Sequence, residues 1–375
     1  MNLMMKHFLA LFVAITVSAI TPLASLKRND FASIKSIPSQ VSTGNIVANF
    51  VSSQFGFDGP QLSAVNSTSF DWWYFDAVSP DLKTSIVVVF FTSLSSGFPF
   101  ITPSPDVTSV AIFYSFTNGT VGAIGVPASG AVVSTVADGS QGYFKGVEAT
   151  WVGAPDMSYY QVDVNAPALG VVGRLKLQTK APAHYPCDPA QAGKAMEISP
   201  YMGWANAMPD ATADADFKIL GSRLNFDGIG YHDKNWSDQP FQNNVASWYW
   251  GHGRLGPYSI VWFDAIATDG TEYVSGYAAK NGNIISTTCA PAALKVRPIN
   301  SPYPPFIHTP APDAFSIVLD MGAEGVLSVN LTMEMTIVDV PGMYNRWTGS
   351  MVGSVNGGTL MTAGVAMLEQ FKMLP

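Results

Sequence analysis

The stretch LSVNLTMEMTI, from Leu327 to Ile337, decides the fold class because a hydrophobic side chain recurs at every second position. Successive side chains of a β-strand point to opposite faces of a sheet, so this alternation buries one face and leaves the other in water. The positions in between hold serine, asparagine, threonine and glutamate. We therefore predict a half-buried strand whose inward face carries Leu327, Val329, Leu331, Met333, Met335 and Ile337.

Other segments share the β-branched and aromatic composition that favours strands. They are SIVVVFF from Ser85, SVAIFYSF from Ser109, YYQVDVNA, GRLKLQT, SWYWGHGRL and YSIVWFDAIA. Dipeptides that tolerate positive φ, and therefore suit tight hairpins, are Asn118-Gly119, Asp138-Gly139, Asp227-Gly228, Asp269-Gly270, Asn281-Gly282 and Asn356-Gly357. No stretch of about fifteen residues has the 3.6-residue period of a helix. The sequence predicts an all-β protein of antiparallel hairpins with few, short helices, and it favours barrels over an open sheet.

The length of the chain, 375 residues, suggests two domains, because single cores rarely grow beyond about 250 residues. Residues 181–210 contain prolines and few strand signals, so we predict domains at 26–205 and 206–375. The stretch 298–312, with six prolines, is either a rival boundary or a long loop. Charged residues make up only 12% of the chain, the net charge is −8 and no basic run occurs, so we expect no nucleic-acid partner.

The N-terminus has the layout of a cleavable signal peptide. Lys6 and His7 precede an apolar run from Phe8 to Ile20, and small residues follow it. We therefore predict a signal peptide at 1–25, passage through the secretory pathway, and no stable membrane insertion after cleavage. The alternative is an uncleaved anchor, but the run is shorter than the ~20 residues that span a bilayer.

Secretion would make glycosylation sequons and a disulfide usable. We predict glycosylation at Asn66, Asn118 and Asn330, whereas a fourth sequon, at Asn235, lies in a polar cluster and is expected to make internal contacts. The two cysteines, Cys187 and Cys289, can form one bridge or remain free thiols, and the sequence leaves this open.

Signatures of common catalytic sites are absent from the sequence. GHGRLG, Gly251 to Gly256, matches the dinucleotide fingerprint, but Pro257 and another predicted strand follow it, so no helix is available to hold a pyrophosphate. A metal site built from His232, Asp233 and His252 is disfavoured, because neighbouring strand residues face opposite ways. We predict neither a cofactor nor a metal.

A polar and aromatic cluster, GIGYHDKNWSDQPF, spans Gly228 to Phe241. In an extended strand, Tyr231, Asp233 and Asn235 share one face, and His232, Lys234 and Trp236 share the other. FDWWYFD (70–76) and SWYWGH (247–252) have the same mixed character, and each precedes a similar hydrophobic segment. Such clusters suit a pocket for a large apolar ligand. The alternative is a polar network that holds a barrel mouth together.

These three motifs, in this order and spacing, resemble the fungal Diels–Alderases of polyketide biosynthesis, which are related to the carotenoid 1,2-hydratase (hydroxyneurosporene synthase) group. The resemblance extends from about Phe50 to near the C-terminus. It implies two lipocalin-like antiparallel β-barrel domains with a pocket at or near their interface. It also implies an intramolecular [4+2] cycloaddition of a linear polyene tetramic acid or pyrrolinone, released by a polyketide–peptide synthetase, to a decalin or a cytochalasan isoindolone.

The resemblance also implies site residues, carried over by matching motif positions. The expected polar, catalytic contacts are Tyr231, Asp233, Asn235 and Thr92, and the expected substrate-binding residues are Tyr74, Trp73, Trp236 and Trp250. Arg346 is a candidate for the basic residue that some members contribute from the second domain. Catalysis would come from holding diene and dienophile in contact and from hydrogen bonds to the conjugated carbonyl.

Two other functions fit the same residues. A hydratase acting on a carotenoid-like polyene needs an acid to protonate an alkene, with Asp233 or Asp71 as the donor. A secreted lipocalin-like carrier needs only the apolar pocket. Sequence does not separate a carrier from a catalyst, because both need the same cavity.

Overall fold

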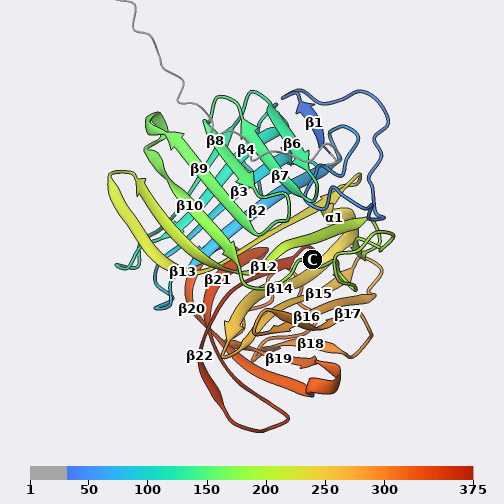
Figure 1. Cartoon of the computed structure of the whole chain (residues 1–375), viewed down its shortest axis with the longest axis vertical. Helices are drawn as coiled ribbons and strands as arrows, with labels where there is room; N and C mark the ends of the chain where they lie inside the picture. The colour runs from blue at the N-terminus through green and yellow to red at the C-terminus, as the bar shows by residue number, and fades with distance from the viewer. Residues whose placement is uncertain (1–31, 375) are drawn as a thin grey trace, which may run out of the picture. The chain divides into compact units, whose positions relative to one another are not determined.

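The computed structural model describes residues 32–374, and these residues form two antiparallel sheets (Figure 1). The predicted signal peptide lies outside the described residues. The first sheet contains β1 (Ala32–Ile37), β2 (Phe70–Val78), β3 (Ser85–Ser93), β4 (Thr108–Ser115), β5 (Val121–Pro127), β6 (Ala131–Val136), β7 (Gly139–Phe144), β8 (Ala149–Gly153), β9 (Tyr159–Ala166), β10 (Val171–Thr179), β11 (Glu197–Ser199), β12 (Met202–Ile219) and β13 (Ser222–Ser237), with the short helix η1 (Pro167–Leu169) before β10. Its strand order is β1-β6-β7-β8-β9-β10-β12-β13-β2-β3-β4-β5, and β11 pairs with β12.

The second sheet follows the short helix α1 (Phe241–Asn244). It contains β14 (Val245–Leu255), β15 (Tyr258–Ala267), β16 (Glu272–Lys280), β17 (Asn283–Thr288), β18 (Leu294–Ile299), β19 (Ala314–Asp320), β20 (Val326–Val340), β21 (Tyr344–Val355) and β22 (Met361–Lys372), with η2 (Gly322–Glu324) before β20. The order is β17-β16-β15-β14-β22-β21-β20-β19-β18. Both sheets curl into half-barrels, so the all-β, lipocalin-like prediction is confirmed. Within residues 32–374, neither path of paired strands closes on itself.

The alternating stretch that predicted a strand lies in β20, where Leu327, Val329 and Leu331 are buried and the residues between them are exposed. The predicted turns hold at Gly119, Gly270, Gly282 and Gly357, which all have positive φ. Gly139 and Gly228 are exceptions, because Gly139 begins β7 and Gly228 lies inside β13. A Cβ at Gly228 would lie 2.0 Å from the Val78 carbonyl oxygen, so this glycine permits close contact between two strands and forms no turn.

The buried residues within 32–374 form three hydrophobic clusters that pack against the sheets. One contains residues of the first sheet and its loops, and another contains residues of the second sheet. The third joins side chains from both, including Trp72 of β2, Trp248 of β14 and Phe371 of β22. Strand β2 is buried on both faces because Trp73 and Phe75 point into the first cluster and Trp72 and Tyr74 into the shared one. The junction between the sheets is therefore itself a hydrophobic core.

The change from one sheet to the other occurs at residues 238–244. The predicted boundary between residues 205 and 206 falls inside β12, which pairs with both β10 and β13. This strand was not predicted from the sequence because it contains Pro209, and proline weakens a strand signal. The pairing of β12 with β13 shifts register between Ala205 and Ala211, an irregularity that accommodates the proline. The proline-rich stretch 298–312 begins with the last two residues of β18 and continues as the loop that joins β18 to β19.

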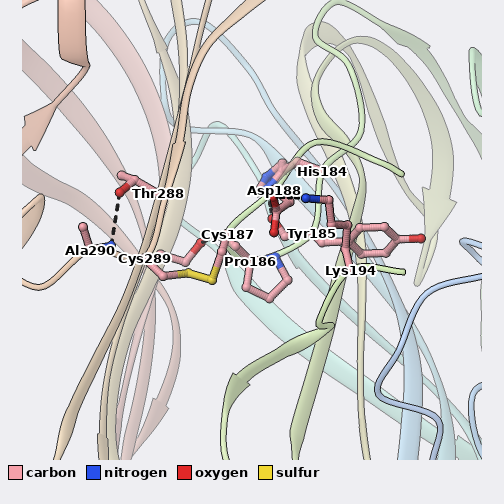
Figure 2. Close-up of a disulfide and its surroundings, with 10 residues drawn as sticks. His184, Tyr185, Pro186, Cys187, Asp188, Lys194, Thr288, Cys289 and Ala290 are labelled. Atoms are coloured by element: carbon pink, nitrogen blue, oxygen red, sulfur yellow. Dashed lines mark hydrogen bonds and ion pairs between the residues drawn. A yellow bond between two sulfur atoms is a disulfide. The ribbon is translucent and has the colours of Figure 1, made fainter. Parts of the chain in front are cut away.

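Cys187 and Cys289 form a disulfide, which answers the question that the sequence left open (Figure 2). Cys187 lies in the segment between β10 and β11, and Cys289 directly follows β17. The bond therefore ties a loop of the first sheet to the edge of the second. Two side chains of β16 reinforce this contact: Ser275 donates to the Pro186 carbonyl at 2.5 Å, and Tyr277 donates to the Pro182 carbonyl at 2.9 Å.

The sequons differ in accessibility. Asn118 and Asn330 are exposed, and Asn66 is half-buried, with its Oδ1 accepting hydrogen bonds from Thr68 and Ser69. Asn235 is buried, as expected from its place in the polar cluster. Glycosylation at the first three positions stays a prediction. Within residues 32–374, no helix is long and apolar enough to cross a membrane.

Candidate active site

A pocket lined by aromatic side chains lies at the junction of the two sheets. Its cavity volume is about 40 Å³. The space is therefore narrow, and a bicyclic ligand would have to displace some of the surrounding side chains. The lining residues are Trp72, Tyr74, Val89, Phe91, Phe98, Phe100, Phe113, Asp233, Asn235, Trp248, Trp250, Phe263, Tyr344, Arg346, Glu369 and Phe371.

Strand periodicity explains this lining. Six strands each contribute two residues that are two positions apart, as side chains on one face of a strand must be. The pairs are Trp72 and Tyr74 on β2, Val89 and Phe91 on β3, Asp233 and Asn235 on β13, Trp248 and Trp250 on β14, Tyr344 and Arg346 on β21, and Glu369 and Phe371 on β22. The two similar sequence segments, WWYFD and WYWGH, thus supply walls of one pocket from different sheets.

Asp233 is the carboxyl group on the first-sheet side of the pocket, and only 3% of it is exposed. The Trp204 indole and the Tyr231 hydroxyl each donate a hydrogen bond to its Oδ2 at 2.8 Å. Burial raises the pKa of Asp233 to about 7, although these two hydrogen bonds act in the opposite direction. A substantial fraction of Asp233 is therefore protonated near neutral pH, and it can donate a proton.

Glu369 is the carboxyl group on the second-sheet side. Its Oε2 accepts hydrogen bonds from Arg346 Nη2 at 2.9 Å and from the Tyr344 hydroxyl at 3.0 Å. Burial raises the pKa of Glu369, and the Arg346 guanidinium opposes that rise. The guanidinium also lies 5.0 Å from the Tyr74 ring and 5.2 Å from the Phe113 ring. Arg346 therefore brings a buried positive charge to the pocket wall, held between a carboxyl group and aromatic faces.

A second polar group lies behind this pocket and joins the sheets. Asp76 Oδ2 accepts a hydrogen bond from the Tyr74 hydroxyl at 2.8 Å and lies 2.9 Å from His252 Nε2. The His252 ring stacks on the Tyr231 ring at 4.3 Å. Tyr74 and Tyr231 are thus held by residues of both sheets, and Tyr231 in turn holds Asp233.

The histidines considered for a metal site do not meet. His232 lies 3.0 Å from Asp58 inside the first sheet, whereas His252 contacts Asp76 at the junction. Asp233 faces the pocket and Trp204 instead. Residues 32–374 contain no group of three or more side chains arranged to hold a metal ion.

Four of the eight predicted site residues line the pocket: Tyr74, Trp250, Asp233 and Asn235. Tyr231 lies directly behind it and contacts it through Asp233. The further candidate, Arg346, lines it as well. Asn235 donates through Nδ2 to the Gly203 carbonyl at 3.2 Å, a contact that fixes the amide at the pocket wall.

Trp73, Trp236 and Thr92 lie elsewhere, in the interior of the first sheet. The Lys234 ammonium lies 4.6 Å from the Trp73 ring and 4.7 Å from the Trp236 ring, and it pairs with Asp71 at 2.6 Å. The Thr92 hydroxyl donates to the Asp71 carbonyl at 3.1 Å. The physical reason is alternation, because Trp73 and Trp236 occupy the opposite strand face from Tyr74 and Asp233. Their contacts surround a buried ion pair and do not reach the pocket.

The sequence motifs missed much of the lining. Trp248 was detectable, since it precedes Trp250 by two positions in the quoted motif. Glu369 and Phe371 lie in the last strand, where no motif drew attention to them. A charged residue at an inward position of a strand is the signal that could have identified Glu369, which pairs directly across from Arg346.

Comparison with known proteins fits this arrangement. Residues 32–297 match the family described as Diels-Alderase-like. The chain belongs to the Diels-Alderase-like family. It is 37% identical to the quinolone epoxide rearrangement protein asqO of Emericella nidulans over 89% of this chain and 92% of that protein. It is 36% identical to the quinolone epoxide rearrangement protein penF of Penicillium thymicola over 89% of this chain and 94% of that protein. It is 25% identical to the Diels-Alderase ucsH of an Acremonium species, over 59% of this chain and 56% of that protein.

Solved structures agree on the fold. The crystal structure of CghA with Sch210972 superposes with a TM-score of 0.76 at 17% identity, covering 92% of this chain and 99% of that chain. Kievitone hydratase from Nectria haematococca superposes with a TM-score of 0.52 at 12% identity, covering 90% and 97%. The resemblance inferred from the motifs is confirmed. The chain is an enzyme of the isomerase or cyclase type.

Proposed function

We propose that this family member rearranges an epoxide carried by a quinolone-type substrate, with Asp233 as the proton donor. The observation that carries this proposal is a buried carboxyl group whose pKa is raised to about 7 by burial, facing a pocket of aromatic rings. Two relatives that align with most of the chain are named for quinolone epoxide rearrangement, which supports the substrate class.

In the proposed reaction, the Asp233 carboxylic acid transfers its proton to the epoxide oxygen while one carbon–oxygen bond breaks. A positive charge develops on the carbon that loses oxygen. A neighbouring group migrates to that carbon, or a nucleophile of the same molecule attacks it, and the proton released at the end returns to the Asp233 carboxylate. The product is an isomer of the substrate, so no external reagent is consumed. General acid catalysis of this kind contributes about 10²- to 10⁴-fold in rate.

The pocket walls suit a transient cation. Aromatic faces attract positive charge through their quadrupoles. The rings of Trp72 and Tyr74 from the first sheet and of Trp250 from the second line the pocket. The low water content of so narrow a space would also keep solvent from attacking the cation.

An intramolecular [4+2] cycloaddition of a polyene tetramic acid is the second candidate. The apolar lining favours it, because folding a polyene so that diene and dienophile touch needs a shaped hydrophobic cavity. Relatives named as Diels-Alderases support it too, and two of them are each 25% identical to this chain. The product, decalin or isoindolone, is part of this candidate and not of the first.

Incubation of the purified chain with a quinolone epoxide and, separately, with a polyene tetramic acid tests both candidates. Products are separated by liquid chromatography and identified by mass spectrometry and NMR. Isomerisation of the epoxide that is lost in Asp233→Asn supports the rearrangement. Loss of polyene absorbance with formation of one cycloadduct supports cycloaddition. In water labelled with heavy oxygen, incorporation of one labelled oxygen atom into the product would identify a hydratase. Binding of a substrate without conversion would identify a carrier.

We also propose that the chain passes through the secretory pathway. The Cys187–Cys289 disulfide supports this, since such bonds persist in oxidising compartments. Mass spectrometry of the mature protein from its host tests it by locating the N-terminus and any glycan on Asn118 or Asn330.

A further inference from the structure

Three buried N–H donors of the pocket lining have no acceptor among the described residues: Arg346 Nη1, Trp248 Nε1 and Trp250 Nε1. The three residues are 5%, 2% and 3% exposed, so water does not compensate freely for the missing hydrogen bonds. Folded proteins leave few buried donors unpaired, because each one costs stability. Three that line one pocket indicate that a ligand supplies the acceptors.

Neighbouring rings hold these donors in place. The Trp248 ring packs edge-on against Phe263 and Phe371, with ring centroids 4.8 Å away in each case. The Trp250 ring packs edge-on against Tyr74 at 5.4 Å and Tyr231 at 5.2 Å. An indole clamped in this way cannot turn its N–H toward another acceptor without disturbing the surrounding core.

Arg346 is held just as firmly. Its Nε and Nη2 both donate to Glu369 Oε2, at 3.3 Å and 2.9 Å. Because the guanidinium is planar, these two bonds fix the direction of Nη1. Nη1 therefore remains available for a ligand while the charge of Arg346 stays paired.

The donors belong to two ends of the pocket. Burial raises the pKa of Glu369, and the Trp248 N–H, which points toward that carboxyl group without reaching hydrogen-bonding geometry, opposes the rise. Burial and Asp233 raise the pKa of Tyr231, and the Trp250 N–H opposes that rise in the same way, again without a formed hydrogen bond. Trp248 and Arg346 thus flank Glu369, whereas Trp250 lies beside Tyr231 and Asp233.

We infer that Trp248 and Arg346 bind the carbonyl oxygen of a cyclic amide, and that Trp250 faces the substrate oxygen that receives the proton from Asp233. This inference rests on the proposed function for the second oxygen only. A cyclic amide is present in 2-quinolones and in tetramic acids, so the first contact applies to substrates of both candidate classes. A carbonyl oxygen accepts from both donors because it has two lone pairs. The two contacts fix which end of the substrate meets Asp233.

Binding of small probes tests the carbonyl contact without catalysis. Quinolin-2(1H)-one carries the cyclic amide, and naphthalene has the same ring size without it. Isothermal titration should show tighter binding of quinolin-2(1H)-one than of naphthalene. Trp248→Phe keeps a ring but removes the N–H. It should therefore weaken the binding of quinolin-2(1H)-one by about tenfold and change the affinity for naphthalene by less than twofold. Arg346→Gln should weaken the same probe, but it leaves Glu369 without its cation and can prevent folding, which makes Trp248→Phe the decisive variant.

Trp262→Phe is the matched control, because Trp262 is buried in the second-sheet cluster and does not line the pocket. It should leave the affinity for both probes unchanged. Equal affinity of the two probes for the unmodified chain, or an equal loss of both in Trp248→Phe, would overturn the inference. Discrimination between the probes together with no conversion of any epoxide would retain the carbonyl contact and refute the proposed reaction.

Discussion

The Tyr231 hydroxyl donates a hydrogen bond to Asp233 Oδ2 across 2.8 Å. This bond stabilises the carboxylate, so its loss raises the pKa of Asp233, which burial has already brought to about 7. If the protonated form is the active one, activity falls as pH rises through that pKa. Tyr231→Phe should therefore move the alkaline limb of the pH–kcat profile upward by about one unit. Asp233→Asn should lower kcat by about 10²- to 10⁴-fold.

The comparison needs a folded protein, which circular dichroism of both variants checks. An alkaline limb that stays in place in Tyr231→Phe, or moves to lower pH, contradicts the role of Asp233 as an acid. A kcat in Asp233→Asn within twofold of the unmodified chain contradicts it as well.

Stability should depend on pH through the same carboxyl. Because the pKa of Asp233 is raised by burial from 3.8 to about 7 in the folded chain, the folded state holds a proton that the unfolded state has lost between these values. The free energy of unfolding therefore decreases as pH rises from about 4 to about 7, and Asp233 contributes at most about 4 kcal/mol to that decrease.

Urea denaturation at several pH values measures this contribution as a difference between the unmodified chain and Asp233→Asn. The difference cancels groups common to both, such as His184, whose pKa burial lowers to about 4, and Asp264, whose pKa burial raises to about 7. Parallel curves for the two proteins across this range would show that Asp233 is ionised in the folded state.

The fold was predictable because period-two alternation is a local property. Leu327 to Leu331 alternate in sequence and in burial alike. The failures have local causes as well. Pro209 reduced the strand signal of β12, and Gly228 was interpreted as a turn residue although it permits close contact between strands. Register and sheet order depend on contacts between distant segments, which one sequence does not reveal.

The site was predictable where a residue belongs to a motif and also lies on the strand face that points to the pocket, as for Tyr74, Asp233 and Trp250. Trp236 was assigned to the pocket because its place in a motif was given more weight than its strand face, which it shares with Lys234. Glu369 was not predictable from the sequence, for a different reason. Its partner, Arg346, is adjacent only through the pairing of β21 with β22, a relationship across strands.

The ion pair of Lys234 with Asp71 should be a strong determinant of stability. Lys234 is completely buried between two tryptophan rings, and its Nζ lies 2.6 Å from Asp71 Oδ1. Lys234→Met leaves an uncompensated buried carboxyl and should lower the free energy of unfolding by about 3–5 kcal/mol in urea denaturation. Lys234→Met combined with Asp71→Leu should recover most of that loss. Equal destabilisation of the single and double variants would show that packing against the rings, and not charge, is responsible.

The disulfide should stabilise the attachment of the first sheet's loop to the second sheet. Its cysteines are 102 residues apart, and closing a loop of that length removes chain entropy worth up to about 5 kcal/mol from the unfolded state. Dithiothreitol should therefore lower the Tm of the unmodified chain. The variant Cys187→Ala/Cys289→Ala should have that lower Tm with or without reductant. A Tm of the unmodified chain that does not respond to full reduction, verified by thiol titration, would contradict a stabilising role.

Phe100 should control the size of ligand that the pocket accepts. It lines the pocket and also a neighbouring groove over β4 and β5, as do Phe91 and Phe113. Of these three, only Phe100 lies in the segment between β3 and β4. Phe100→Ala should connect the two spaces and raise the affinity for 2-butylnaphthalene relative to naphthalene by about threefold to tenfold, because the butyl group would be buried.

Phe98→Ala is the matched control for this substitution. Phe98 belongs to the same segment and lines the pocket, but it does not line the groove. Its truncation enlarges the pocket without joining the two spaces, so the ratio of the two affinities should stay near that of the unmodified chain. If both truncations raise the ratio of the two affinities equally, the added space lies in the pocket itself and Phe100 does not separate the pocket from the groove. If neither does, the groove is separated from the pocket by Phe91 and Phe113 alone.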